Sequence, residues 1–146
     1  MKNSNNYSTS DQAEEVFYLA FQQSDIKMMM SVWSKSEDII CIHPGGPRLE
    51  GWDIVRQSWE HIFINERGIS FDVKQKKILE VNNISIHHVI EVISVNGEVQ
   101  SGIIATNIYA KTENGWHMIL HHASPELLTE IFQSDSGDLG ELQTVH

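Results

Sequence analysis

The sequence predicts a single α+β domain, in which about three helices come first and a curved antiparallel sheet follows. Apolar residues recur at helical spacing in the first part of the chain and at every second position beyond Gly68. Two asparagine-glycine pairs, Asn96-Gly97 and Asn114-Gly115, lie between β-branched or aromatic residues, which is a strong short-range signal for a hairpin. Because helices and strands are segregated along the chain, the helices must cover one face of the sheet.

Three segments carry apolar residues along one helical face. The first covers about residues 11–23 and opens with Asp11 and Glu14 in the spacing of a capping box. The second is short and spans about residues 24–33, and the third covers about residues 52–64. We therefore expect about three helices before the main part of the sheet.

The strands are predicted from alternating apolar and polar residues. Three long strands are expected near residues 84–95, 98–111 and 116–123, with a shorter strand or a pair of strands within 70–81 and another at 38–42. The tight turns between the long strands make their pairing antiparallel.

The second hairpin turn predicts which side chains share a face of the sheet. A two-residue loop at residues 114–115 sets Asn107 opposite His122 and Tyr109 opposite Leu120. We expect this face, and not the face that carries the neighbouring His121, to look towards the helices.

The register of the preceding strand stays open. If residues 96–97 form a simple turn, His88 lies on the same face as Asn107. A single bulge would move His87 and Glu91 onto that face instead.

Length and composition bound the function. The 146 residues suit one domain, which we place at residues 10–132, between a disordered segment at 1–9 and an acidic flexible tail at 133–146. The formal net charge of -10 argues against a nucleic-acid or membrane partner. The polar start of the sequence lacks the apolar core of a secretion signal and no run of roughly 18 apolar residues occurs, so we expect a cytoplasmic protein. The single cysteine, Cys41, lies in an apolar run and is predicted to be a small buried residue.

Two stretches carry a resemblance to a known family. They are "IHPGGPRLEGW" within the first half of the chain and "NGWHMILHHASP" at the end of the predicted sheet. Together with the order of elements, they resemble the nuclear transport factor 2-like (NTF2-like) superfamily, in particular its SnoaL-like and ketosteroid-isomerase-like bacterial members, over about residues 11–128. The resemblance implies a cone-shaped sheet wrapped around a pocket that the helices close, and a homodimer formed through the sheet.

The same resemblance implies candidate site residues. The general-base aspartate of the steroid isomerases precedes a proline, and here that position corresponds to His43. Their oxyanion-hole aspartate falls at or near Asn107, and their oxyanion-hole tyrosine falls near Phe17, with Tyr18 one residue away. These departures argue against steroid isomerisation by that family's mechanism.

Proton transfer next to a carbonyl group is the chemistry that these residues permit. A neutral imidazole at His43 can accept a proton, the Asn107 amide can donate to a developing enolate oxygen, and His122 is the predicted acid partner. The outcome would be isomerisation, cyclisation or dehydration. In the alternative interpretation, His43 ends a strand and only bonds the backbone of the turn that follows it.

The predicted ligand is an apolar small molecule, and no cofactor and no metal are predicted. A site of three histidines, formed by His43, His122 and either His87 or His88, is a conceivable alternative. Large side chains could form the pocket wall or simply fill the core. These candidate ligand-binding residues are Tyr18, Trp33, Trp52, Trp59, Tyr109 and Leu120.

Two classes of function remain after this reasoning. The first is a small-molecule enzyme of the isomerase or lyase type. The second is a non-catalytic dimerisation or ligand-binding module, like the kinase-association and transport-adaptor members of the superfamily. Both classes fit a homodimer, since an apolar outer face of the sheet is predicted at Ile104, Ile108, Ile119 and Ala123.

Overall fold

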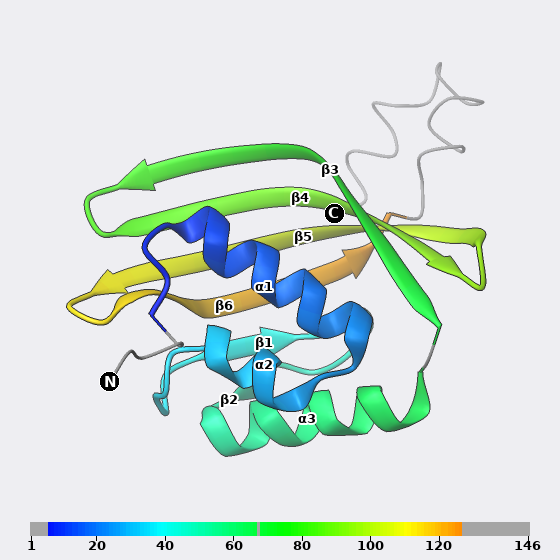
Figure 1. Ribbon diagram of the computed structural model, residues 1–146, viewed down its shortest axis with the longest axis horizontal. Coiled ribbons are helices and arrows are strands. Elements are labelled where there is room, and N and C mark those ends of the chain that lie inside the picture. Colours follow the sequence, from blue (N-terminus) through cyan, green and yellow to red (C-terminus); the bar gives the residue numbers. More distant parts are fainter. Residues whose placement is uncertain (1–5, 67, 127–146) are drawn as a thin grey trace, which may run out of the picture.

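The computed structural model describes residues 6–66 and 68–126 and contains the predicted helices and an extended sheet (Figure 1). The three helices are α1 (Ser10–Gln23), α2 (Ile26–Val32) and α3 (Trp52–Asn65). The six strands are β1 (Ile40–Ile42), β2 (Leu49–Glu50), β3 (Ile69–Val81), β4 (Ile84–Val95), β5 (Glu98–Thr112) and β6 (Gly115–Pro125). The predicted tail at 133–146 and residues 1–5 of the predicted N-terminal segment lie outside the described residues.

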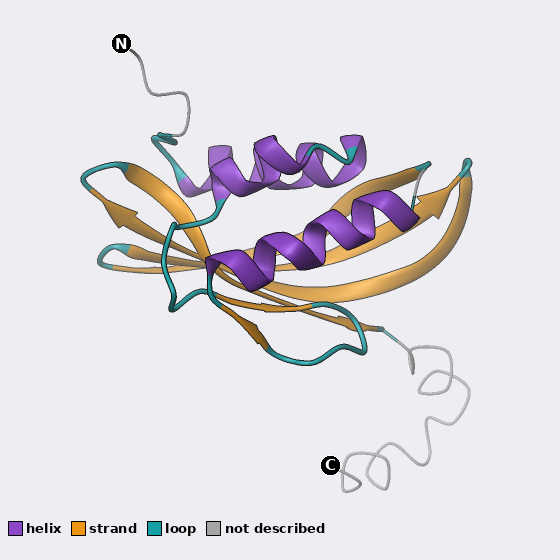
Figure 2. Ribbon diagram, turned by 90° about the horizontal axis from the view of Figure 1, so that it is seen from below, coloured by secondary structure: helices purple, strands orange, loops and turns teal. Residues whose placement is uncertain are grey.

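The strands form one curved, unclosed sheet with all three helices on its concave side (Figure 2). The strand order is β2-β1-β6-β5-β4-β3. The predicted α+β cone is therefore confirmed, with one difference in strand direction. Strand β1 runs parallel to β6, so that Cys41 pairs with His121, while the other neighbouring pairs are antiparallel. The sheet is thus mixed, because the chain passes through α1 and α2 before β1 and returns to β6 only after the meander β3-β4-β5.

The start of α1 differs from the predicted capping box. The side chain of Thr9 caps the helix by accepting a hydrogen bond from the Gln12 N–H at 3.0 Å. Asp11 therefore lies in the first turn of the helix, and Glu14 is buried with 3% exposure against the sheet. A side chain that local spacing assigned to helix capping is instead part of the protein interior.

The inward face of β6 differs from the predicted one because the pairing of β5 and β6 contains a β-bulge. The hairpin closes with Thr112 opposite Gly115, so its two-residue loop is 113–114 and not the predicted 114–115, and the register then shifts between Ile108 and Tyr109. Through these two differences Asn107 pairs with His121 rather than with the predicted His122. A bulge adds one residue to one strand and so exchanges the two faces beyond it.

The consequence of this bulge is visible in the burial of β6. Asn107 and Tyr109 face inward as predicted and are fully buried, while His121 is 1% exposed. The prediction that His122 and Leu120 share this inward face is wrong, because His122 is exposed and Leu120 is only half-buried on the outer side. The same shift turns Ala123 inward, so it does not belong to the outer apolar face predicted for it.

A second bulge decides the register of β4. The pairing shifts between Ile93 and Ser94, close to the turn at residues 96–97, and sets His87 opposite Asn107. His87 and Glu91 are therefore buried on the concave face, as the bulged alternative predicted.

The core lies between the helices and the concave face. Phe17 and Trp59 pack edge to face with their ring centres 5.6 Å apart, and both are fully buried. Cys41 is fully buried, as predicted. Within residues 6–66 and 68–126, no helix is long and apolar enough to cross a membrane, and the cytoplasmic location stays a prediction.

We expect Gly115→Ala to destabilise the protein more than Gly97→Ala. Both glycines have positive φ, at +93° and +87°, so each alanine costs about 1–2 kcal/mol in backbone strain. A Cβ at Gly115 would also lie 2.6 Å from the Tyr7 carbonyl oxygen, which accepts a hydrogen bond from the Trp116 N–H, whereas a Cβ at Gly97 meets nothing within 4 Å. The clash should add about 1–3 kcal/mol. Urea unfolding of both variants measures the difference, and equal losses would contradict it.

Candidate functional site

A pocket of about 400 Å³ opens between α1, α3 and the concave side of the sheet. Most of its wall is apolar, and three of its ionisable groups, His43, Glu91 and His121, come from three different strand segments. The lining residues are Phe21, His43, Pro44, Ser58, His61, Ile62, Glu66, Glu91, Ile93, His121 and Ala123. An apolar cavity with a few convergent polar groups is the usual form of a small-molecule site.

His43 follows the last residue of β1 and serves both the turn and the pocket. Its carbonyl oxygen accepts a hydrogen bond from the Gly46 N–H at 2.8 Å, which closes the turn. Its Nε2 lies 2.9 Å from the Ser58 hydroxyl, which itself donates to the Val55 carbonyl oxygen. The hydroxyl oxygen therefore accepts from Nε2–H, and Nδ1 keeps the free lone pair. Burial lowers the pKa of His43 to about 4, so the ring is neutral at pH 7.

His121 is held in one tautomer by Asn107. The Asn107 amide nitrogen donates to Glu14 Oε2 at 3.1 Å and to the Tyr18 hydroxyl at 2.9 Å, which turns its oxygen towards His121. That oxygen lies 2.6 Å from His121 Nδ1, so Nδ1 carries the proton and Nε2 keeps a lone pair. Burial, followed by the nearby His43 and His122, lowers the pKa of His121 to about 3.

Glu91 is the acidic group of the pocket. Its side chain is 2% exposed, and the Tyr18 hydroxyl donates to Oε2 at 2.6 Å. Burial raises the pKa of Glu91 to about 7, with a further rise from the charge of Glu14 and an opposing effect of the Tyr18 hydrogen bond. Burial and the Glu91 charge also raise the pKa of Tyr18, which keeps its proton and remains a donor. The carboxyl group therefore exchanges its proton near neutral pH, as a general acid or base requires.

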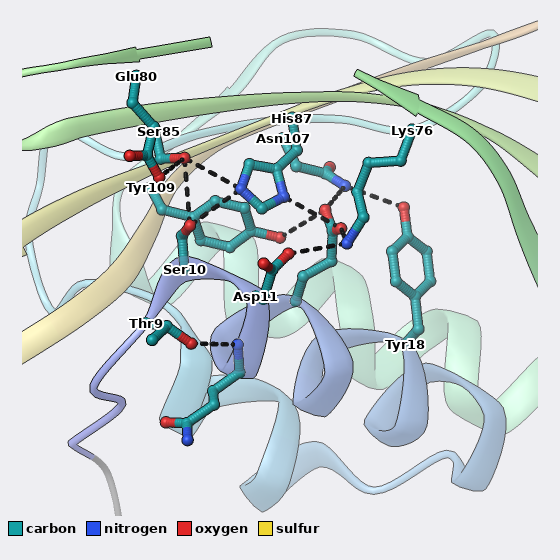
Figure 3. Close-up of polar contacts among 12 residues, drawn as sticks. Thr9, Ser10, Asp11, Tyr18, Lys76, Glu80, Ser85, His87, Asn107 and Tyr109 are labelled. Atoms are coloured by element: carbon teal, nitrogen blue, oxygen red, sulfur yellow. Dashed lines mark hydrogen bonds and ion pairs between the residues drawn. The ribbon is translucent and has the colours of Figure 1, made fainter. Parts of the chain in front are cut away.

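A network of polar side chains connects α1 to the sheet (Figure 3), and it reaches the pocket through Asn107 and Tyr18, which contact His121 and Glu91. Its centre is Glu14, which accepts hydrogen bonds from Asn107 and from the Tyr109 hydroxyl, forms an ion pair with Lys76 at 3.0 Å and lies 3.1 Å from His87 Nδ1. Burial by itself would raise the pKa of Glu14, but the contacts with His87, Asn107 and Lys76 lower it to about 2. The charged carboxylate is thus stabilised in the interior.

The predicted site residues are divided among several places. Of the nine, His43 alone lines the pocket, while Asn107, Tyr18 and Tyr109 belong to the network that connects α1 to the sheet. Trp59 packs edge to face against the His43 ring at 4.7 Å between ring centres and so supports the pocket from the core. Trp33 and Trp52 line a different groove, and Leu120 and His122 lie on the outer face of the sheet.

Three residues of the candidate site are absent from the set predicted from the sequence, namely Glu14, Glu91 and His121. Glu91 appeared only under the bulged register of β4, and His121 was placed on the wrong face. Glu14 was interpreted as a capping residue, although it lies one helical turn before Tyr18 and therefore points in a similar direction. The sequence signal for the buried position of Glu14 was that this acid shares a helical face with aromatic residues.

Among the described residues, one group has metal-ligating atoms close together. It consists of Asp11, Glu14 and His87, whose ligand atoms lie within 4.8 Å of one another, and it contains neither His43 nor His122. The Lys76 ammonium lies 2.9 Å from Asp11 and 3.0 Å from Glu14, so a cation already neutralises both carboxylates. The alternative metal site of three histidines that was considered from the sequence therefore differs from this group.

The family can now be assigned. The family model described as a SnoaL-like domain matches residues 11–127. The chain belongs to the SnoaL-like family. Structural neighbours from the NTF2-like superfamily agree with this assignment, so the resemblance predicted from the sequence is confirmed.

Two solved structures and one curated relative are similar to this SnoaL-like chain, and their names describe different roles. A candidate calcium/calmodulin-dependent protein kinase type II association domain from Thiobacillus denitrificans has 33% identity and a TM-score of 0.79, over 82% of this chain and 97% of that one. A candidate dehydratase of the NTF2-like family from Streptomyces avermitilis has 28% identity and a TM-score of 0.74, over 80% and 93%. The F-box protein SKIP8 of Arabidopsis thaliana is 25% identical over 78% of this chain, which spans about half (48%) of that protein's length.

The pKa of Glu91 predicts a pH effect on stability. A carboxyl group whose pKa is raised from 4.5 to about 7 on folding stabilises the fold below pH 4.5, and this contribution is lost as the pH rises through about 7. The free energy of unfolding of Glu91→Gln, relative to that of the wild type, should therefore rise by about 2–3 kcal/mol between about pH 5 and pH 8. Urea unfolding of both proteins at these two pH values measures the rise. Glu15→Gln, at an exposed position of α1, should behave like the wild type, and a Glu91→Gln variant with the wild-type pH dependence would contradict the assignment.

Proposed function

We propose that this SnoaL-like protein binds a small, mostly apolar molecule in the 400 Å³ pocket and transfers a proton to or from it. One observation carries the proposal. Three ionisable groups, Glu91, His43 and His121, converge on a cavity whose remaining wall is largely apolar, and two of their imidazole nitrogens have free lone pairs. Such a set is suited to acid-base chemistry and exceeds what a packed core requires.

Glu91 is the proton-transferring group in this proposal. When protonated it can donate to a ligand carbonyl oxygen, and when ionised it can remove a proton from the neighbouring carbon. The low pKa values of His43 and His121 make them weak bases but good neutral acceptors for a ligand hydroxyl group. In a dehydration, the C–H proton would pass to the ionised carboxylate of Glu91, and the protonated carboxyl group would then give that proton to the hydroxyl group, which leaves as water as the C–O bond breaks and the C=C bond forms. Isomerisation and cyclisation need the same first step.

The charges in the pocket lining favour a neutral ligand over an anionic one. None of the residues that line it is a lysine or an arginine, and Glu66 and Glu91 are its carboxyl groups. Anionic ligands would meet these acids without a counter-charge, so a neutral carbonyl compound fits better. The cavity volume suits a molecule of one or two rings.

A non-catalytic module is the second candidate function. The observation that favours it is the neighbour from Thiobacillus denitrificans, a candidate kinase association domain that is 33% identical over 82% of this chain. In this case the pocket would hold a ligand without converting it, and assembly through the sheet would be the main activity.

Proton transfer by Glu91 can be measured without knowing the natural substrate. We expect the protein to catalyse exchange of the α-protons of small cyclic ketones in D₂O, and Glu91→Gln to lower this rate about 10²-fold or more with unchanged ketone affinity. The exchange is followed by NMR, and affinity by native mass spectrometry. Glu15→Gln is the matched control outside the pocket. Ketone binding with no exchange in the wild type would favour the module.

Both candidates include a homodimer formed through the outer face of the sheet. This face carries two cross-strand isoleucine pairs, Ile86–Ile108 and Ile90–Ile104, and Leu79 and Val81 at its edge are 65% and 62% exposed. A monomer seldom leaves such a patch in water. The mass of 16.7 kDa for one chain makes the dimer about 33 kDa.

Ile108→Glu should convert this dimer into a monomer, because it would bury a charge in the apolar interface. Sedimentation at micromolar concentration measures the change. Ile64→Glu is the control, since Ile64 is 71% exposed at the end of α3 and lies away from the sheet's outer face. A wild type that sediments only as a 16.7 kDa species would remove the dimer from both candidates.

A further inference from the structure

A second groove, of about 830 Å³, lies apart from the pocket that contains Glu91 and shares no lining residue with it. It is formed by α2 and the segment after it, the first turns of α3, and the hairpin between β5 and β6. Its charged and aromatic lining residues include Lys27, Lys35, Arg56, Glu113, Trp33 and Trp52. We call it the α2-α3 groove.

We propose that the α2-α3 groove binds an amphipathic organic anion, meaning an apolar body that carries a carboxylate, sulfonate or phosphate group. The first argument is charge. The chain has ten lysines and arginines and a net charge of -10, yet Lys27, Lys35 and Arg56 all line this groove, against the single carboxylate of Glu113. The groove is therefore a local cationic site on an anionic protein, and its field favours a negative ligand.

The second argument is the position of these cations relative to Trp52. Arg56 lies one helical turn after Trp52, so both side chains project from the same side of α3. The Lys35 Nζ lies 5.7 Å from the centre of the Trp52 ring. An anion bound by Lys35 and Arg56 would thus lie beside a large aromatic surface. Arg56 also contacts Glu60 at 3.3 Å, but both side chains are about half exposed, and such a pair is readily exchanged for a ligand anion.

The apolar part of the ligand is suggested by the rest of the wall. Ile26, Met30, Trp33 and Trp52 all line the groove beside the cations. The indole Nε1 of Trp33 is buried, and the described residues provide no hydrogen-bond acceptor for it. A ligand oxygen that reached Trp33 would supply the missing acceptor. Apolar side chains, and an indole whose N–H lacks an acceptor, line this groove together with its cations, which distinguishes it from an ordinary solvated patch of lysines.

The probe for the test is 1-anilinonaphthalene-8-sulfonate, an amphipathic anion whose fluorescence rises on binding. We expect saturable binding at one site per chain, competed by 2-naphthoate and at least 10-fold less well by its neutral counterpart, 2-naphthylmethanol. Lys35→Gln combined with Arg56→Gln should weaken binding at least 10-fold, and Trp52→Ala should also weaken it. Circular dichroism and urea midpoints show whether each variant folds.

Two controls make the proposal refutable. Lys74→Gln combined with Lys77→Gln removes the same charge from exposed positions of β3 and should change the affinity less than twofold. Ala123→Leu narrows the pocket that contains Glu91 and should leave probe binding intact. The proposal would be overturned if both double variants weakened binding equally or if Ala123→Leu abolished binding. It would also be overturned if the neutral compound competed as strongly as the anion or if the wild type showed no saturable binding.

Discussion

The arrangement of the interior depends on one buried carboxylate, that of Glu14. It comes from α1 and is contacted by residues of three strands, namely Lys76 of β3, His87 of β4, and Asn107 and Tyr109 of β5. A carboxylate in this position must be charged and fully paired, since an uncompensated buried charge costs about 3–5 kcal/mol. The pairing fixes how α1 lies across the sheet. It also orients the Asn107 amide, because the nitrogen must face Glu14 and the oxygen must therefore face His121.

The pocket inherits its chemistry from this constraint. The tautomer of His121 follows from the orientation of Asn107, and the Tyr18 hydroxyl connects Asn107 to Glu91 through two further hydrogen bonds. The negative charge of Glu14 also contributes to the raised pKa of Glu91. Two acids of the same interior thus have opposite behaviour. Glu14 is surrounded by donors and cations and stays ionised, whereas Glu91 has one donor and an apolar pocket and binds its proton near neutral pH.

The sequence was sufficient for the order of helices and strands, because helical and strand periodicities and tight turns are local properties. It was not sufficient for the faces of β6, since alternation alone cannot reveal a bulge. Both sides of that strand carry apolar residues and adjacent histidines, so shifting by one residue leaves a pattern that is equally plausible. The bulge between Ile108 and Tyr109 therefore exchanged His122 for His121. The place of His43 at the end of a strand could be predicted from the proline and glycines after it, while the role of Glu14 depends on partners 62 to 95 residues away in the chain.

The two cavities of this fold differ in the charges that line them. The pocket on the concave side has acids and neutral imidazoles and no lysine or arginine in its lining, while the α2-α3 groove has three cations and one carboxylate. The same helix contributes to both, with Ser58 and Ile62 on one side of α3 and Trp52 and Arg56 on another. Because a helix repeats every 3.6 residues, these positions differ in direction, and each face can evolve its own electrostatic character. A neutral ligand in the first site and an anion in the second would therefore not compete for the same groups.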